Sequence, residues 1–397
     1  MDPRRLAVVP LMLAIAACST PGDSPAQPQT APPPPPTTSV APNPNAVAQD
    51  GRPFEVNEVA TFDRPWAMAF LPDGRALLTE KGGTLRVVDP QTGRSTKVTG
   101  TPEVVDEGQG GLADVALGPT YDEDGTIYLS WVEKADEPGE TRGVVGKARL
   151  VLDGPPALKK LTTIWRQDPQ SGSGHYSLRL AISPDGDNLF VTSGERQKFT
   201  PAQDVRTDLG KILRLTLDGE HVDDNPFAEQ HEKAATVWSY GHRNVLGIAF
   251  DAAGNLWASE MGPKGGDELN LIEPGADYGW PDYSEGSHYD GRAIPPHSQG
   301  ASKDVVAPIL SWVPSISPAN LMIYSGTAFP AWKGDALIGG LSGQCLVRVH
   351  LDGTTATKAD QWDMGARIRD VVQGPDGAIW LLTDGPDGKL LRLTPPR

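Results

Sequence analysis

A short pattern of turn residues followed by apolar residues recurs along the chain from Phe54 onward. Each copy begins with a turn rich in Asp and Gly, continues as a short apolar run and ends in polar residues or Gly. The six copies are PDGRALLTEKGG from residue 72, EDGTIYLSWVEK from 123, PDGDNLFVTSGER from 184, AAGNLWASEMGP from 252, KGDALIGGLSGQ from 333 and PDGAIWLLTDGP from 375. Because short apolar runs bounded by turn residues are typical of β-strands, the pattern predicts six equivalent strands.

The spacing of the copies predicts how these strands are arranged. Successive copies begin about 40 to about 80 residues apart, which leaves room in each repeat for four strands and loops of different length. We therefore expect an all-β fold, a six-bladed β-propeller of four-stranded antiparallel blades, over residues 51–397. Propellers build their sites from loops at one face of the central channel. The polar endings of the six copies are therefore candidates for one shared site.

Composition supports this fold and narrows the range of ligands. The chain has 397 residues, and its 44 Gly and 38 Pro fit a fold with many turns. The formal net charge is −16 and no cluster of Lys and Arg stands out, which argues against a nucleic-acid-binding protein because phosphates require a basic surface. Cations and small neutral molecules remain as ligands.

The N-terminal sequence MDPRRLAVVPLMLAIAACST predicts export. Two Arg residues precede an apolar run that ends in small residues, which is typical of a signal peptide and too short for a stable membrane span. The ending IAAC resembles a bacterial lipoprotein signal, so we expect residues 1–17 to be removed and Cys18 to be lipidated. With Ser19 next, the protein would face the periplasm and be held at the outer membrane only by this lipid anchor. An ordinary secretory signal is the alternative.

The segment after the lipoprotein signal predicts a spacer. It is rich in Pro and poor in large apolar residues, as in APPPPPTTSVAPNPN, and so cannot bury a core. We expect a stiff, extended and disordered linker over residues 18–50. Lipidation of Cys18 would leave Cys345 without an intramolecular disulfide partner. We interpret Cys345 as a small buried hydrophobic residue.

Common catalytic motifs are absent, and the candidate polar residues are dispersed. The chain contains no G-x-G-x-x-G, P-loop, G-x-S-x-G, H-E-x-x-H or paired C-x-x-C motif, so nicotinamide, nucleotide, serine-hydrolase and zinc chemistry have no local support. In ASEMGPKGGDELN, residues 258–270, the glycines allow unusual backbone conformations that turn carbonyl groups toward a ligand. A bound metal ion would explain this segment.

Several ordered motifs resemble the bacterial quinoprotein aldose sugar dehydrogenases, relatives of soluble glucose dehydrogenase that use pyrroloquinoline quinone (PQQ) and calcium. The resemblance covers the domain from about Phe54 to Pro395. The motifs are RPWAMAFLPDG, EGQGGLADVAL, GHYSLRLAISPDG, AQDVRTDLGKILRL, SYGHRN, EMGPKGGDELNLIEPGADYGWP, PSISPANLMIYSG and RIRDVVQGPDG. The resemblance implies an enzyme that oxidises the C1 hydroxyl group of an aldose to a lactone and passes the electrons to an external acceptor.

The resemblance also implies two catalytic residues. His175 lies at the position of the family's catalytic base, which takes the proton of the C1 hydroxyl while hydride passes to the quinone. Imidazole suits this role because its ordinary pKa is close to neutral pH. Glu195, in SGERQ, lies where an acidic residue orients that histidine and favours the right tautomer.

Five further residues match positions that contact the cofactor in the family. Planar guanidinium groups bind carboxylates in a bidentate manner, and PQQ carries three carboxylates. The last two of the five occupy alternate positions of a predicted strand, so their side chains are expected on the same side of the sheet. The implied cofactor-binding residues are Gln109, Arg243, Asn244, Arg367 and Arg369.

The resemblance implies two calcium ions near the Gly-rich segment. Backbone carbonyl groups at Gly262 and Pro263 match the ligands of the ion that touches the quinone, whereas Glu268 and Tyr278 match positions that bind a structural ion. Calcium accepts mixed carbonyl and carboxylate oxygen ligands without strict geometry. The ion at the active site would act as a Lewis acid on the quinone carbonyl group.

Three positions depart from the family pattern. Ser342 lies at or next to a position where many members carry a lysine near the cofactor, so we expect weaker cofactor binding. Met261 replaces a histidine or glutamine and changes the wall of the site. Leu178 stands where a small residue is common, and we expect it to narrow the sugar pocket.

Two other functions remain open. A calcium-dependent propeller lactonase would share the fold and metal without requiring Gln109 or the arginine pair. A non-catalytic propeller that binds sugars or envelope partners would follow if the departures abolish cofactor binding. Lactone hydrolysis without dye reduction would identify the first, and failure to bind PQQ at saturating calcium would identify the second.

Overall fold

The structure, a computed structural model, describes residues 52–300 and 304–396. The predicted signal peptide over residues 1–17 and linker over residues 18–50 lie outside the described residues. Among the described residues, no helix has the length and hydrophobicity that a membrane span requires. The described helices are α1 (Tyr121–Asp124), η1 (Thr200–Gln203), η2 (Ala234–Thr236), η3 (His297–Gln299) and η5 (Pro330–Trp332).

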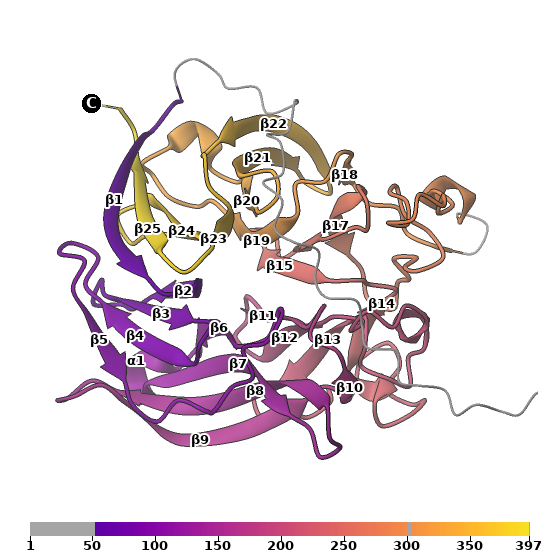
Figure 1. Cartoon of the computed structure of the whole chain (residues 1–397), viewed down its shortest axis with the longest axis horizontal. Helices are drawn as coiled ribbons and strands as arrows, with labels where there is room; N and C mark the ends of the chain where they lie inside the picture. The colour runs from indigo at the N-terminus through magenta and orange to yellow at the C-terminus, as the bar shows by residue number, and fades with distance from the viewer. Residues whose placement is uncertain (1–51, 301–303, 397) are drawn as a thin grey trace, which may run out of the picture. The chain divides into compact units, whose positions relative to one another are not determined.

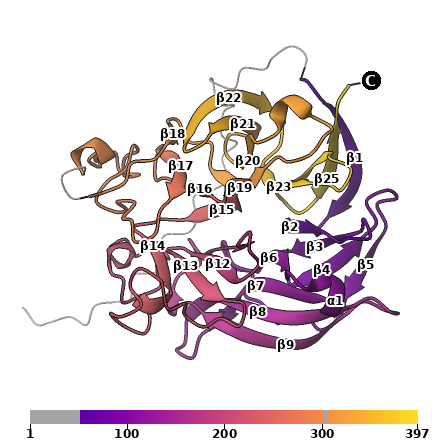
Figure 2. The ribbon, with the colours of Figure 1, turned by 180° about the vertical axis from the view of Figure 1, so that it is seen from behind.

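The strands form six antiparallel sheets around a common centre, which confirms the predicted six-bladed β-propeller (Figures 1 and 2). Five sheets have four strands, and the second blade has a fifth, two-residue strand at its edge. Blade 1 contains β2 (Pro65–Phe70), β3 (Ala76–Glu80), β4 (Thr84–Val88) and β5 (Ser95–Val98); blade 2, β6 (Leu112–Leu117), β7 (Thr126–Lys134), β8 (Glu140–Val151), β9 (Ala157–Arg166) and β10 (Gln170–Ser171); blade 3, β11 (Ser177–Ile182), β12 (Asn188–Ser193), β13 (Lys211–Thr216) and β14 (Val237–Tyr240); blade 4, β15 (Val245–Phe250), β16 (Leu256–Glu260), β17 (Asp267–Ile272) and β18 (Leu310–Trp312); blade 5, β19 (Pro318–Ile323), β20 (Ala336–Gly340), β21 (Cys345–Asp352) and β22 (Thr355–Asp363); blade 6, β23 (Ile368–Gln373), β24 (Ile379–Thr383), β25 (Gly388–Thr394) and β1 (Glu55–Phe62).

Each copy of the sequence pattern contains the second strand of one blade. These strands, β3, β7, β12, β16, β20 and β24, are buried over almost their whole length. A strand with a neighbour on each side and a packed sheet on each face needs apolar residues at successive positions. This double burial explains why the second strands give the strongest sequence signal.

The first strand of every blade lies at the centre of the ring of blades. Successive first strands pack against one another in a closed ring, from β2 through β6, β11, β15 and β19 to β23 and back to β2. Each also has an irregular register near its start, which bends the strand where it leaves the loop. These shifts lie between Pro65 and Ala67, Leu112 and Val115, Ser177 and Leu180, Val245 and Gly247, Pro318 and Leu321, and Ile368 and Asp370.

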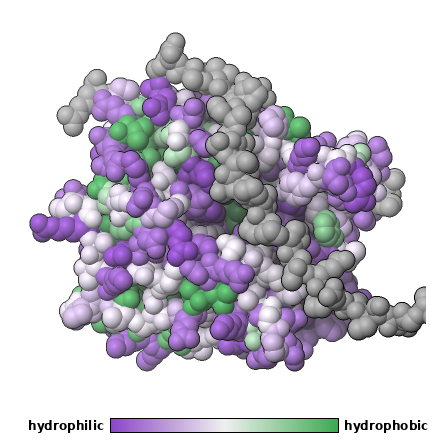
Figure 3. Space-filling model, in the orientation of Figure 1, coloured by the Kyte–Doolittle hydropathy of each residue, from purple (hydrophilic) through white to green (hydrophobic). Residues whose placement is uncertain are grey.

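The ring is closed by pairing the two ends of the domain. Strand β1 pairs with β25 in an antiparallel register from Glu55 with Thr394 to Phe62 with Gly388, and so completes blade 6. Apolar clusters between neighbouring blades form the core. Cys345 is fully buried in one of them with a free thiol, as predicted. The face drawn in Figure 3 is largely hydrophilic, with small, scattered hydrophobic patches.

Candidate active site

Polar residues at the blade ends contact one another across blade boundaries. Glu195, from the end of the third pattern copy, donates its backbone N–H (3.0 Å) to the carbonyl oxygen of Arg243, which lies in the loop between β14 of blade 3 and β15 of blade 4. The Arg243 guanidinium in turn donates to the carbonyl oxygen of Gly262, at the end of the fourth copy (2.8 Å). The predicted convergence of pattern endings is therefore present for these two copies.

His175 and Glu195 form a buried pair. His175 Nδ1 lies 2.5 Å from Glu195 Oε1, and the second carboxylate oxygen accepts the backbone N–H of Phe199 at 2.6 Å. The two residues are only 7% and 1% exposed. Within the described residues, nothing hydrogen-bonds to His175 Nε2. The ring therefore has one nitrogen fixed by a carboxylate and the other available to a ligand.

The charge states of this pair suit a proton acceptor. Burial and the nearby Arg243 lower the pKa of His175, although Glu195 opposes this effect. Burial alone would raise the pKa of Glu195, but its contacts with His175 and with the Phe199 N–H outweigh burial and lower it. At neutral pH the imidazole is therefore neutral, with its proton on Nδ1, and the carboxylate is ionised.

The backbone around His175 is strained. Of the eleven non-Gly residues with positive φ in the described chain, six lie in the segments 175–178 and 196–199, among them His175 (48°) and Phe199 (65°). Such conformations are costly for bulky residues and concentrate at functional sites. Gly194 permits the close approach of the two segments, because a Cβ atom there would lie 2.1 Å from the His175 carbonyl oxygen.

Two more predicted residues contact this strained segment. Gln109 Oε1 accepts the backbone N–H of His175 at 2.8 Å. Asn244 Oδ1 accepts the hydroxyl of Ser177 at 3.1 Å, which ties the start of β11 to the start of β15. The structure thus brings Gln109 and Asn244, as well as Glu195, to the segment that carries His175.

The Gly-rich turn after β16 faces the positively charged side chain of Arg243. Arg243 Nη1 donates to the carbonyl oxygens of Met261 (3.1 Å) and Gly262 (2.8 Å), whereas Pro263 is buried. Asp267 fixes the turn by accepting the backbone N–H of Gly262 at 2.9 Å. These carbonyl groups are therefore oriented toward positive charge, as a metal ligand requires.

Carboxylate groups gather behind this turn at a small cavity whose walls include Glu260, Gly262, Glu268 and Tyr278. Burial and the neighbouring Glu260 raise the pKa of Glu268 well above its usual range. A bound cation would stabilise the ionised form of such a group.

The oxygen atoms beside Glu268 fit calcium. Asn270 donates to Glu268 at 3.1 Å, while its own Oδ1 is buried without a partner among the described residues. The Tyr278 hydroxyl donates to the carbonyl oxygen of Leu271 rather than to Glu268. The backbone carbonyl oxygen of Tyr278 accepts a hydrogen bond from His297 Nε2, and this nitrogen lies 3.7 Å from Glu268 Oε1. In the described chain, no three His, Cys, Asp or Glu side chains form a metal-binding group. A calcium ion here would therefore also need backbone carbonyl and side-chain amide oxygens as ligands. Calcium binds both kinds of oxygen in proteins.

The predicted arginine pair shares one carboxylate. Arg367 Nε lies 2.8 Å from Asp384 Oδ2, and Arg369 Nη2 lies 2.9 Å from Asp384 Oδ1, so both side chains point to the same side, as expected. The side chain of Arg367 is 45% exposed and that of Arg369 only 15%. The Arg369 guanidinium also lies 5.8 Å from the ring centre of Trp66. The two arginines can offer positive charge to a bound anion, while Asp384 holds their side chains in place.

The three departures from the family pattern have different surroundings. The Ser342 hydroxyl lies 2.7 Å from that of Ser317, in a small cluster of hydroxyl groups. The Met261 sulfur accepts the Asn244 side-chain amide at 3.7 Å. Leu178 has a φ of 68°, is 1% exposed and packs against Gly143, so its side chain lies in the core; its effect on the sugar pocket stays a prediction.

Sequence reasoning missed several residues that support the site. Asp384 and Glu260 both end copies of the recurring pattern, and that position was the available signal. Glu260 accepts the backbone N–H groups of Arg243 and Asn244, so it fixes the start of β15. Phe199 belongs to none of the sequence motifs. Its backbone N–H reaches Glu195 only through a positive φ, which the sequence does not reveal.

Comparison with known proteins shows that this chain is similar to sugar dehydrogenases. A family model described as Glucose / Sorbosone dehydrogenase matches residues 62–392. The chain is 38% identical over 342 residues to the aldose sugar dehydrogenase YliI of Escherichia coli, a match that covers 84% of this chain and 91% of that protein. It is 28% identical over 413 residues to quinoprotein glucose dehydrogenase B of Acinetobacter calcoaceticus, covering 82% and 84% of the two chains.

Among solved structures, aldose sugar dehydrogenases also match this chain over most of its length. The apo form of the soluble aldose sugar dehydrogenase from Escherichia coli matches with a TM-score of 0.81 and 36% identity, over 86% of this chain and 100% of that one. The PQQ-bound aldose sugar dehydrogenase from Streptomyces coelicolor matches with a TM-score of 0.73 and 32% identity, over 86% and 98%.

Proposed function

The chain belongs to the glucose/sorbosone dehydrogenase family, and from that premise we propose that it oxidises the C1 hydroxyl group of aldose sugars with PQQ as cofactor. The observation that carries this proposal is the buried His175–Glu195 pair, 2.5 Å apart, beside Gln109 and Arg243. This arrangement can accept a proton from a hydroxyl group in a site that also offers positive charge.

The residues present fit a tricarboxylate cofactor. Arg243, Arg367 and Arg369 supply guanidinium groups, and Gln109 and Asn244 supply amide groups. All five lie at or just before the start of the first strand of a blade. PQQ, when bound, supplies the acceptor for the hydride that leaves C1. The serine at position 342 adds no charge, so these arginines would carry the electrostatic part of cofactor binding.

The protein's own residues perform the proton transfer. The neutral His175 takes the C1 hydroxyl proton on Nε2 as hydride leaves the same carbon, which becomes the lactone carbonyl carbon. The imidazolium that forms is stabilised by the ionised Glu195 through the Nδ1–H bond. The Phe199 N–H holds the other carboxylate oxygen and keeps Glu195 in position.

We also propose two calcium sites. The carbonyl groups of Gly262 and Pro263 would hold one ion near the cofactor, and Glu268 with the Tyr278 carbonyl group would hold a structural ion. The orientation of the Gly262 carbonyl toward a cation and the partnerless Asn270 oxygen support this assignment. The ion near the cofactor would act as a Lewis acid.

Reconstitution tests this function. The purified protein, loaded with PQQ and calcium, is expected to reduce an artificial dye in the presence of an aldose. The rate should fall about 100- to 10,000-fold in His175→Ala because general-base catalysis is lost. Omission of PQQ or calcium should abolish it. Lactone hydrolysis without dye reduction would support the lactonase alternative, and absence of PQQ binding at saturating calcium would support the non-catalytic one.

Lipid anchoring is a separate proposal that the sequence alone supports. We propose that the enzyme is lipidated at Cys18, exported and held at the outer membrane, where it passes electrons to an external acceptor. Labelled palmitate supplied to expressing cells should enter the wild-type protein and not Cys18→Ala. Equal labelling of both proteins would contradict the proposed anchor.

A further inference from the structure

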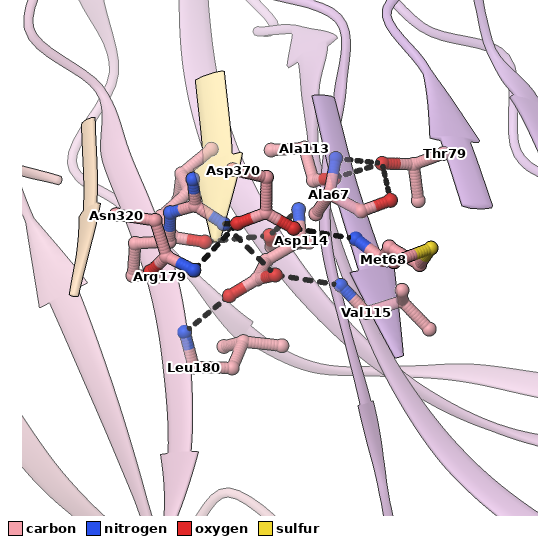
Figure 4. A network of polar contacts seen from close by, with 12 residues as sticks. Ala67, Met68, Thr79, Ala113, Asp114, Val115, Arg179, Leu180, Asn320 and Asp370 are labelled. Carbon is pink, nitrogen blue, oxygen red and sulfur yellow. Dashed lines mark hydrogen bonds and ion pairs between the residues drawn. The ribbon is translucent and has the colours of Figure 1, made fainter. Parts of the chain in front are cut away.

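A buried polar network joins the first strands of the blades, and Figure 4 shows Arg179 with Asp114 and Asp370 within it. All six first strands contribute to the network. Arg179 of β11 lies at its middle, 3.4 Å from Asp114 of β6 and 3.3 Å from Asp370 of β23. Asn320 of β19 donates to Asp370, and β2 contributes the Met68 N–H, which donates to Asp370 at 2.8 Å. Strand β15 contributes the carbonyl oxygen of residue 246, which accepts Arg179 Nε at 2.9 Å.

The network depends on the charge of its single guanidinium. Arg179 is 2% exposed, Asp114 8% and Asp370 1%, so none of the three charges has much access to water. Burial raises the pKa of Asp114, and it raises that of Asp370 to about 6. Because two buried carboxylates repel each other, the guanidinium between them is required to hold both in this arrangement.

Arg179 also connects the two halves of the candidate active site. It lies four residues after His175, on the strand that begins with the strained segment. Its Nη2 donates to the backbone carbonyl of Arg369 at 3.3 Å. Its guanidinium carbon lies 4.1 Å from the ring centre of Trp66, the same indole that the Arg369 guanidinium approaches. One side chain thus contacts both the backbone and the aromatic neighbour of a predicted cofactor-binding arginine.

We propose that Arg179 is a positioning residue for the cofactor site, which holds β23 and its Arg369 in register with the strand that carries His175. The inference rests on the proposed function, since it concerns the binding of PQQ. The planar fork of arginine can reach two carboxylates and two carbonyl groups from different strands at once. A lysine at this position keeps the buried charge but cannot make all of these contacts.

Arg348 offers a matched control. It also bridges two carboxylates, with Nη1 2.6 Å from Asp335 and Nε 2.8 Å from Asp360, and it also lies over a tryptophan, 5.4 Å from the ring centre of Trp332. It belongs to β21, the third strand of blade 5, which β20 separates from the first strand β19. The Arg348 side chain is 19% exposed, so Arg348→Lys reproduces the loss of a partly buried arginine bridge without touching the proposed site.

The test is a titration of the purified full chain with PQQ at saturating calcium, followed by tryptophan fluorescence. Arg179→Lys is expected to raise the Kd for PQQ at least about tenfold, since small displacements of a binding group are costly. Arg348→Lys should leave the Kd unchanged even if both variants lose similar thermal stability. With PQQ saturating, the KM for the sugar should be the same in Arg179→Lys and in the unaltered chain.

The outcomes separate this inference from the proposed function. Failure of the unaltered chain to bind PQQ would overturn both. Binding by the unaltered chain with the same Kd in the two Lys variants would overturn the positioning role alone. If Arg179→Lys does not fold, Asp114→Asn takes its place, because it loosens Arg179 and keeps the size of the side chain. Its Kd should then exceed that of Arg348→Lys, and equal values would overturn the inference.

Discussion

At the scale of single residues, Glu195 is expected to act through His175. It makes a 2.5 Å contact with Nδ1 and is 1% exposed. Glu195→Gln keeps the size of the side chain but removes the charge that stabilises an imidazolium. We expect kcat to fall about 100- to 10,000-fold, as measured by sugar-dependent dye reduction. Glu133→Gln is the control, because among the described residues the Glu133 carboxylate forms ion pairs only with Arg142 and Arg166, both on blade 2.

The pH dependence of the same variant gives a second measurement. The pKa of His175 lies below its ordinary value because of burial, so kcat/KM should rise as pH increases through that lowered pKa and level off above it. Glu195 raises the pKa of His175. Replacing Glu195 should therefore move the acidic limb of the kcat/KM profile to still lower pH. A limb that moves to higher pH would contradict this account of the pair.

Which site residues the sequence could predict depends on what decides their position. His175 and Glu195 lie within ordered motifs, and the structure places them in contact although 20 positions separate them. The direction of the Leu178 side chain depends on a positive φ that no residue type at this position signals. Arg179 and Asp370 look like ordinary strand residues, and only the ring closure brings them together.

At the scale of elements, the closing strand is the strongest test of the fold. Strand β1 covers the edge of β25, and Phe62 at its end is only 6% exposed. A chain that begins at Arg64 would expose that edge and lose the buried ring, which alone contributes about 2 kcal/mol. We expect its thermal midpoint to fall by at least about 5 °C relative to a chain that begins at Gly51. Equal midpoints would show that β1 is dispensable.

The strands differ in how well the sequence predicts them. Second strands such as β24 are continuous apolar runs because both of their faces are buried. Outer strands such as β22, with the pattern TATKADQWD, are largely exposed and give no comparable signal. The pairing of β1 with β25 joins residues more than 300 positions apart, so no local pattern could predict which strand completes blade 6.

At the scale of the whole molecule, the ring arrangement explains how dispersed motifs form one site. Each blade contributes a first strand to the centre. His175 and Arg243 lie in the loops just before two of these strands, and Arg369 lies at the start of a third, β23. The fold was predictable because it repeats, whereas the network around Arg179 was not, since each strand contributes a different residue. The proposed activity therefore depends on residues that the starts of the first strands bring together.

The most direct test of that chemistry is a single turnover without an electron acceptor. The purified protein, loaded with PQQ and calcium under anaerobic conditions, is mixed with D-glucose and other aldoses while the absorbance of the bound quinone is followed. We predict reduction of one quinone per protein with at least one aldose, none with 1,5-anhydro-D-glucitol, which lacks the C1 hydroxyl group, and a rate about 100-fold or more lower in His175→Ala. Bound quinone that no aldose reduces, or reduction at an unchanged rate in His175→Ala, would contradict the proposed function.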